Sequence, residues 1–463
     1  MSLDQITEEL IARQSPEAQV IIRLLLAKIA ELEARLKKTP QNSSLPPSTL
    51  HPHAKPVSKK SKSKKRRGGQ PGHPKHERPL LPTDQCDELH ILKPTACRRC
   101  GRRLAGCDSN PLRHQVWELP EIRPHVSEYQ RHRLRCRDCG ETTCAELPAG
   151  VPQGQSGPRL IAFSGLLMAY FRQSKRRTAL FLEALLNQPC CAALTVKMQQ
   201  QVTRALRPPY DELVKQLPTQ KQLGMDESPT KEGTNKAWLW TAVATAFTVF
   251  GVRLSRAATL IEDWLGEAFD GVITCDRAKM YWAHGRLQWC WAHLKRDFQA
   301  LVDSGDGKAK RLGHDLLRPT HKLFHHWARY RDGTLTRRGW LRLMHPIRQE
   351  IDAFLLRGAF SDNTRLQGMC GPLYDYRDRL WTFLEVEGVE PTNNSSERAL
   401  RHAVIWRKLS FGTQSAAGSR FVETLLTIIE TCRQQNRSVF DFVTQAVAAH
   451  FAGQPAPSLL TGV

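Results

Sequence analysis

The sequence lacks a long uninterrupted apolar segment. Its longest apolar run, Ala237 to Val252, is interrupted by Thr241, Thr245 and Thr248 and is short for a membrane span. The first ten residues, MSLDQITEEL, hold two glutamates and an aspartate, whereas a signal peptide begins with basic residues and an apolar stretch. These absences argue against a membrane anchor and a secretory leader, and they predict a cytoplasmic protein.

Acidic residues are also scarce relative to basic ones. The 463 residues include 45 Asp and Glu but 68 Lys and Arg, which leaves a net charge of +23. Such an excess predicts a polyanionic partner, and without an apolar anchor nucleic acid is favoured over a membrane surface. The hydrophobic fraction of 40% excludes wholesale disorder, and the length is typical of roughly two to four domains.

The positive charge is unevenly placed along the chain. Between His51 and Cys107 there are fifteen Lys or Arg and four acidic residues, so +11 of the +23 lies in 57 residues. The densest part, Lys55 to Gly69, has almost no apolar residue and predicts a flexible basic linker. It is compatible both with a solvated tether and with an arm that binds DNA phosphates. The residues concerned are Lys59, Lys60, Lys64, Lys65, Arg66 and Arg67.

Before the linker, apolar residues alternate at spacings of three and four, which is the heptad pattern of a coiled coil. The residues are Ile22, Leu25, Ile29, Leu32 and Leu36. An amphipathic helix packed on the protein's own core is the alternative. Self-association is favoured because a polar stretch and the basic linker separate this segment from any core.

Thirteen cysteines are present, and seven of them fall between Cys86 and Cys144. In a long intracellular chain the thiols stay reduced, so metal binding is favoured over disulfides. Two Cys-x-x-Cys pairs, each followed by glycine and separated by a segment with β-hairpin alternation, predict a zinc ribbon. Its ligands would be Cys97, Cys100, Cys136 and Cys139. A redox role is the alternative, but two pairs that both contain arginine favour structural zinc.

The rest of the chain changes character near residue 218. Residues 157–217 predict helices, either as a helix-turn-helix or as a packing layer, since the glycine typical of the turn is missing. Beyond them, short apolar strands and helices alternate in a way that predicts a mixed α/β sheet. Residues 301–378 predict basic helices, and two further helices follow at 395–410 and 421–435.

Acidic residues at strand ends are the candidate catalytic groups. Asp226 follows the apolar strand QLGM and Asp276 follows VITC, so the two carboxylates are expected to converge on neighbouring strands. Glu397, in the first turn of a helix that follows PTNNSS, is well placed as a third ligand. Three converging carboxylates that bind two Mg²⁺ ions are suited to phosphodiester cleavage and transfer.

Other acidic residues compete for these roles. Glu227 and Asp263 compete with Asp226, and Asp297 competes with Asp276. Each acidic residue taken alone is more often a helix cap or a surface charge.

Several segments in order resemble a known family. GMDES, ITCDRAKMY, CWAHLKRDF, PTNNSSERALR and RKLSFGTQS resemble bacterial insertion-sequence transposases of the DDE type, in the family numbered sixty-six. Members of that family also carry a leucine-zipper-like segment, an NSS-PPS stretch, a basic GGQPGH motif and a cysteine zinc-finger region. Here these correspond to Ile22 to Leu36, Asn42 to Ser48, Gly68 to His73 and Cys97 to Cys139, so the resemblance covers most of the chain.

The resemblance implies a ribonuclease-H-like fold whose catalytic triad is Asp226, Asp276 and Glu397, with a helical insertion before the glutamate. It implies Mg²⁺ or Mn²⁺ at these carboxylates. The family's Cys-x-x-His pattern corresponds to Cys290 and His293. We interpret this pair as structural or DNA-contacting, because two side chains alone cannot complete a zinc site, and metal binding is the alternative.

Two arginines accompany Glu397 on the same expected helix. Arg398 and Arg401 could hold DNA phosphates, and ion pairing within the protein is the alternative.

The expected fold is thus a multi-domain α/β protein with a ribonuclease-H-like catalytic core. Its expected parts are a coiled-coil helix (1–40), a basic linker (41–84), a zinc ribbon (85–150), a helical DNA-binding region (157–217), the catalytic domain (218–435, with an insertion at about 300–385) and a C-terminal tail (436–463).

The expected activity is that of a transposase, which binds the ends of its element and performs Mg²⁺-dependent cleavage and strand transfer. Its expected partners are element ends and target DNA, further copies of the chain and small accessory proteins, in the cytoplasm at the nucleoid. A nuclease or resolvase without strand transfer is one alternative. An inactive zinc-ribbon DNA-binding protein from a decayed element is the other.

Overall fold

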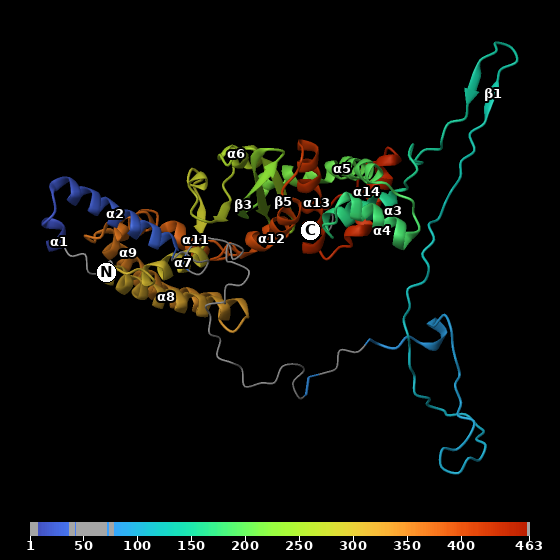
Figure 1. Ribbon diagram of the computed structural model, residues 1–463, viewed down its shortest axis with the longest axis horizontal. Coiled ribbons are helices and arrows are strands. Elements are labelled where there is room, and N and C mark those ends of the chain that lie inside the picture. The colour runs from blue at the N-terminus through green and yellow to red at the C-terminus, as the bar shows by residue number, and fades with distance from the viewer. Residues whose placement is uncertain (1–7, 37–41, 43–71, 74–77, 461–463) are drawn as a thin grey trace. The chain divides into compact units, whose positions relative to one another are not determined.

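The protein is described from a computed structural model, which covers residues 8–36, 42, 72–73 and 78–460 (Figure 1). The chain divides into two compact units, one of Met1–His51 with Pro124–Val463 and the other of Pro52–Arg123, and each is described by itself. The basic-linker residues Lys59, Lys60, Lys64, Lys65, Arg66 and Arg67 lie outside the described residues.

Two helices occupy the N-terminal segment, α1 (Glu8–Ala12) and α2 (Pro16–Leu36). The helix predicted from the heptad pattern is therefore present. Leu25 and Leu32 of the heptad seam are 58% and 48% exposed. Self-association through this seam stays a prediction. Across the described residues, no helix is both long and apolar enough to pass through a membrane.

The cysteine-rich segment has little regular structure. Within Pro52–Arg123 the structure has a short 3-10 helix, η3 (Thr83–Gln85), and an isolated bridge that pairs Ala96 with Arg103 around the first cysteine knuckle. The second knuckle lies in a small antiparallel hairpin in the other unit, between β1 (Arg133–Arg135) and β2 (Thr142–Cys144). The hairpin expected between the two knuckles is not formed: residues 104–132 contain no strand, and the β1–β2 hairpin instead flanks the second knuckle.

Three helices follow where the sequence predicts them: α3 (Pro158–Ala169), α4 (Lys175–Leu186) and α5 (Ala192–Lys215). Asn187 adopts the left-handed conformation at the end of α4, with φ of 50°, and so takes the C-terminal position for which glycine is usual. α5 continues through Pro208 and Pro209 to Lys215.

The segment expected to be a C-terminal tail contains a packed helix. α14 (Val439–Phe451) buries Phe442, Val443 and Val447 and contacts α3 and α5. The helical layer and the sheet share one buried hydrophobic cluster, which explains why these residues are ordered.

A five-stranded mixed sheet forms the centre of the larger unit, as the alternating pattern predicts. Its strands are β3 (Gln222–Glu232), β4 (Asn235–Val243), β5 (Thr248–Arg253), β6 (Val272–Cys275) and β7 (Leu287–Trp289), in the order β5-β4-β3-β6-β7. β3, β4 and β5 are antiparallel neighbours, whereas β6 and β7 run parallel to β3. α6 (Thr259–Leu265) lies between β5 and β6 in the chain.

β3, the strand that carries Asp226, is longer than the sequence predicts. β3 has 11 residues and Asp226 is its fifth, so this aspartate does not end the strand. The pairing with β6 stops at Gly224 and Thr274, while the pairing with β4 continues to Glu232. Asp226 therefore lies just beyond the parallel part of the sheet, as Asp276 does after β6.

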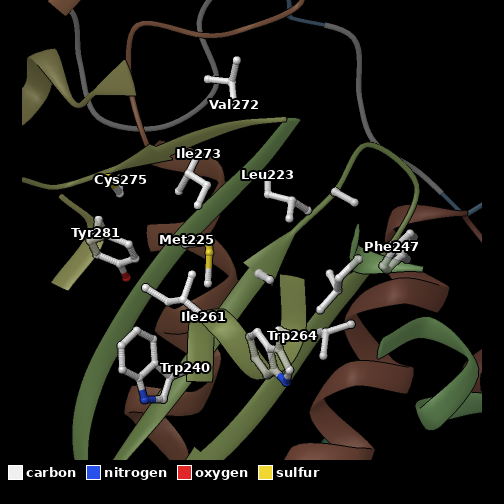
Figure 2. Close-up of a cluster of buried hydrophobic side chains, with 14 of the residues drawn as sticks. Leu223, Met225, Trp240, Phe247, Ile261, Trp264, Val272, Ile273, Cys275 and Tyr281 are labelled. Atoms are coloured by element: carbon white, nitrogen blue, oxygen red, sulfur yellow. The ribbon is translucent and has the colours of Figure 1, made fainter. Parts of the chain in front are cut away.

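Apolar side chains on one side of this sheet make the hydrophobic cluster that Figure 2 shows. Met225 of β3, Trp240 of β4 and Ile273 of β6 are buried there together with Trp264 of α6 and Tyr281. The buried alternate residues of β3, Leu223 and Met225, leave Gly224 and Asp226 on the other face.

The opposite side of the sheet is covered by α12 (Asn394–Ser410) and α13 (Ala416–Gln434), both close to the predicted ranges. α13 lies along the edge strand β5 (Figure 1) and offers three side-chain oxygens at four-residue spacing. Glu423, Thr427 and Thr431 accept the backbone N–H groups of alternate β5 residues, Val252, Phe250 and Thr248. A helix thus satisfies the donors that an edge strand would otherwise leave open.

A helical segment lies in sequence between β7 and α12. It consists of α7 (Trp291–Val302), α8 (Gly307–Arg331), α9 (Arg337–Ala359), α10 (Thr364–Asp375) and α11 (Asp378–Glu385). The indoles of Trp291 and Trp381 pack with ring centroids 4.9 Å apart and join α11 to the start of α7. β7 was not expected, because a three-residue strand is too short to show a pattern.

Candidate functional site

Two aspartates lie side by side just beyond the carboxyl end of the parallel pairing between β3 and β6. Gly224 of β3 pairs with Thr274 of β6. Asp226 lies two residues after Gly224, and Asp276 lies two residues after Thr274. Asp226 Oδ1 accepts the N–H of Glu227 at 2.9 Å, and Asp276 Oδ1 accepts the N–H of Ala278 at 2.8 Å. Both carboxylates are therefore held by the backbone that follows them.

The electrostatic surroundings of Asp226 are unfavourable for a negative charge. Burial raises the pKa of the Asp226 carboxyl well above its usual value, and the charges of Glu227, Asp276 and Glu397 raise it further. Desolvation and like charges both disfavour the ionised form. A divalent cation bound among these groups would compensate for both effects.

Glu397 reaches the same place from the first turn of α12. The helix approaches β3 closely at Gly224, where a Cβ would lie 2.4 Å from Ser396 Oγ. Asn393 donates from Nδ2 to the carbonyl of Met225 at 2.7 Å and pins the helix start to the strand. The structure therefore brings together the three carboxylates that the sequence singled out.

The competing acidic residues have other partners. Glu227 forms an ion pair with Arg256, 2.6 Å away, and accepts the hydroxyl of Tyr281 at 2.7 Å. Asp297 forms an ion pair with Arg277 at 2.5 Å, and Asp263 is exposed on α6. These contacts leave Asp226, Asp276 and Glu397 as the better candidates for a metal.

A cavity of about 540 Å³ opens beside Asp276. Among its lining residues are the cations Arg256, Arg277 and Lys279. Guanidinium and ammonium groups next to a carboxylate cluster suit a substrate with phosphate groups. The other lining residues are Ala278, Met280, His293 and Asp297.

Cys290 and His293 also belong to this neighbourhood. Cys290 precedes α7 and His293 lies in its first turn, and together with Glu397 they form a group whose ligand atoms lie within 4.8 Å of one another. His293 Nδ1 is 3.7 Å from Glu397 Oε1. Burial raises the pKa of the Cys290 thiol to about 11 and lowers the pKa of the His293 imidazole.

No feature of the sequence indicated that Glu397 would join this pair. The Cys-x-x-His spacing names two ligands only, and the third side chain comes from a helix more than a hundred residues later. The sequence therefore predicted the pair but not the third residue of the group, and the role of the pair stays a prediction.

The four cysteines of the expected zinc ribbon form two similar knuckles. Gly101 N–H donates to the carbonyl of Cys97 at 2.9 Å, and Gly140 N–H donates to that of Cys136 at 3.1 Å. The φ values of the two glycines are 72° and 75°, a conformation that favours glycine.

In each knuckle backbone N–H groups point at the first sulfur. The N–H of Cys100 lowers the pKa of the Cys97 thiol, and the N–H of Cys139 lowers that of Cys136. Such knuckles suit thiolate ligands. Cys97 and Cys100 belong to one unit and Cys136 and Cys139 to the other, so the four-cysteine site stays a prediction.

Arg398 and Arg401 are exposed on α12. Neither forms an ion pair with another residue of the described part of the chain, so the alternative of internal pairing has no support there. Their assignment to DNA phosphates remains a prediction.

Comparisons with known proteins address the same regions. The model of the Transposase IS66 family matches residues 155–420, which include β3, β6, the helical segment and α12. A second model, Family of unknown function (DUF6444), matches residues 7–79.

One curated relative is similar over part of its length. The "Uncharacterized protein y4qI" of Sinorhizobium fredii (strain NBRC 101917 / NGR234) is 26% identical over 256 residues, 50% of this chain and 47% of that protein. This chain therefore spans about half the length of that relative. Because the first family model covers more than half of the chain and includes all three clustered carboxylates, this chain belongs to the Transposase IS66 family.

Proposed function

We propose that this protein is a DDE-type transposase, which cuts the ends of a mobile element and joins them to target DNA. The observation that carries the proposal is the convergence of Asp226, Asp276 and Glu397 from β3, β6 and α12, within the region that matches the family. The three carboxylates come from segments that only the fold brings together.

Asp226, Asp276 and Glu397 would hold the Mg²⁺ (or Mn²⁺). They fit a hard divalent cation because they are oxygen ligands. The mutual repulsion that raises the pKa of Asp226 also calls for a compensating cation. When bound there, the metal supplies charge neutralisation for in-line phosphodiester displacement.

The proposed reaction has two displacements. In the first, water attacks a phosphodiester at the element end, and the broken P–O bond leaves a 3′-hydroxyl. In the second, that hydroxyl attacks a target phosphodiester, so a new P–O bond joins element to target and a target 3′-hydroxyl leaves. Arg256, Arg277 and Lys279 line the cavity beside Asp276 and would orient the phosphates.

Other parts of the chain would capture DNA. The mixed sheet of antiparallel β3–β5 and parallel β6 and β7 supports the proposed ribonuclease-H-like core. The basic linker, the predicted zinc ribbon and the helices α3–α5 would bind element ends, and α2 would pair two protomers. Pairing matters because both ends must be held before strand transfer.

A strand-transfer assay tests the proposal. Purified protein is mixed with labelled element ends, target plasmid and Mg²⁺, and cleavage and joining are followed separately. Asp276→Asn is expected to reduce both by roughly 10³-fold or more, since it removes a metal ligand worth several kcal/mol. Asp263→Asn is the matched control, because Asp263 is exposed on α6 and should leave both steps unchanged.

The other outcomes discriminate between the alternatives. Joining that persists in Asp276→Asn refutes the catalytic assignment. Cleavage without joining by the parent protein favours a nuclease or resolvase. Binding of element ends without any metal-dependent cleavage favours an inactive DNA-binding protein.

A further inference from the structure

A cluster of metal-ligating side chains lies beside the proposed magnesium site. Cys290, His293 and Glu397 offer one sulfur, one imidazole nitrogen and one carboxylate oxygen within 4.8 Å of one another. Cys290 and His293 are three residues apart at the start of α7, so both face the same side. Glu397 completes the group from the start of α12.

Two of these atoms lack hydrogen-bond partners. Among the described residues, His293 Nδ1 and Glu397 Oε1 are enclosed without any hydrogen bond, although they lie 3.7 Å apart. A buried polar atom without a partner is costly and calls for an explanation. The neighbouring cation does not supply one, because Arg296 Nη2 is 3.9 Å from Glu397 Oε1, beyond hydrogen-bond distance.

The backbone already holds the two helix starts together. Trp291 N–H donates to the carbonyl of Pro391 at 2.9 Å, and Asn393 N–H donates to Cys290 Sγ at 3.2 Å. These contacts join both ends of the helical segment between β7 and α12. A ligand group built on this junction is therefore preorganised, and a bound ion would tie the ends of the segment together.

We propose that Cys290, His293 and Glu397 bind a zinc-class divalent ion, separate from the magnesium that the three carboxylates would hold. Thiolate and imidazole are ligands that Zn²⁺ prefers and Mg²⁺ does not. Binding replaces the S–H bond of Cys290 by a sulfur–metal bond and releases the proton to solvent. Three protein ligands leave a fourth position for water or a phosphate oxygen.

The zinc-class site rests on the proposed function only in that Glu397 would be a ligand of both the zinc-class ion and the Mg²⁺. A carboxylate has two oxygens, so Oε1 can bind the zinc-class ion while the other oxygen binds Mg²⁺. The zinc-class ion would then orient Glu397, and it would act as a positioning device for the magnesium site.

The test measures zinc in the full-length protein. The predicted ribbon is first removed by Cys97→Ser, Cys100→Ser, Cys136→Ser and Cys139→Ser, so that any remaining zinc reports on the new site. This background chain is expected to retain about one zinc per chain by elemental analysis. Adding Cys290→Ser or, separately, His293→Ala is expected to remove it.

Matched variants separate ligation from folding. Cys432→Ser changes another fully buried thiol, on α13, and should leave the zinc content unchanged. Co²⁺ bound to the background chain in place of zinc gives a second measurement that needs no further variant. A thiolate ligand then produces a sulfur-to-cobalt absorption band. Zinc retained in both Cys290→Ser and His293→Ala, or the absence of zinc and of the cobalt band from the background chain, overturns the proposal.

Failure of this proposal and failure of the proposed function give different results. Asp276→Asn should abolish joining and keep the zinc. A background chain without zinc that still depends on Asp276 refutes the zinc-class site alone. A chain that binds zinc at Cys290 but joins DNA without Asp276 refutes only the catalytic assignment.

Discussion

Two acidic groups, one on the sheet and one on a helix beside it, have opposite surroundings. Glu423, on α13, is fully buried, and its carboxylate meets Arg207 at 3.0 Å and Arg420 at 3.1 Å while accepting the N–H of Val252. The charges that most affect Asp226 are those of Glu227, Asp276 and Glu397, all of its own sign.

The comparison separates a structural carboxylate from a functional one. A buried charge must be compensated, and the chain supplies guanidinium groups for Glu423. Around Asp226 the neighbouring charges are also negative, so a cation from outside the chain has to compensate for them. An acidic residue that the protein leaves uncompensated is therefore the better guide to a metal site than burial alone.

Removal of Glu423 should have the largest effect on stability. Glu423→Ala leaves Arg207, Arg420 and the Val252 N–H without their shared partner, and we expect a loss of about 3 kcal/mol in the free energy of unfolding. Urea denaturation measures it, with Glu183→Ala at an exposed position of α4 as control. A loss no larger than that of Glu183→Ala would contradict the role of Glu423 as a structural carboxylate.

Neutralisation of Asp226 should act in the opposite direction. In magnesium-free buffer, Asp226→Asn is expected to stabilise the protein by about 1 kcal/mol, because it relieves repulsion within the acidic cluster. In a separate assay with Mg²⁺, the same variant is expected to lose DNA joining. If Asp226→Asn destabilises the chain as Glu423→Ala does, Asp226 is compensated within the protein and the comparison fails.

The difference in stability between Asp226→Asn and the parent protein should depend on pH. Since the folded-state pKa of Asp226 lies above its value in the unfolded chain, the folded protein holds an extra proton between the two values. The contribution of this group to stability is thus greatest at low pH and is lost as the pH rises through the folded-state pKa. The advantage of Asp226→Asn over the parent should grow with pH in magnesium-free urea denaturation, and a constant difference would contradict the raised pKa.

A smaller loss than that of Glu423→Ala is expected at the edge of the sheet that α13 covers. Thr427→Val removes the acceptor of the Phe250 N–H and is expected to cost about 1–2 kcal/mol. Thr424→Val is a close control on the same helix, because the Thr424 hydroxyl is buried without a hydrogen-bond partner among the described residues. Equal losses in both variants would show that the hydroxyl contact to β5 contributes nothing specific.

Local patterns predicted much of the larger unit. The apolar periodicity of α3, α4, α12 and α13 and the apolar strands β4 and β5 are visible in the chain, and their ranges agree with the structure within a few residues. The three carboxylates were also predictable as candidates, because Asp226 and Asp276 follow apolar strand residues. Strand length was not, since β3 extends past Asp226 only because β4 pairs with it to Glu232.

Local patterns in the chain were enough to predict the mixed α/β class, the positions of most helices and the identity of candidate carboxylates, because each of these depends on neighbours within a few residues. Three contacts became visible only in the folded chain: α14 packs against α3 and α5, Glu423 meets Arg207 and Arg253, and Glu397 lies next to Cys290 and His293. Those contacts join residues separated by a hundred positions or more. They follow from how the helices close over the sheet, which no local pattern records.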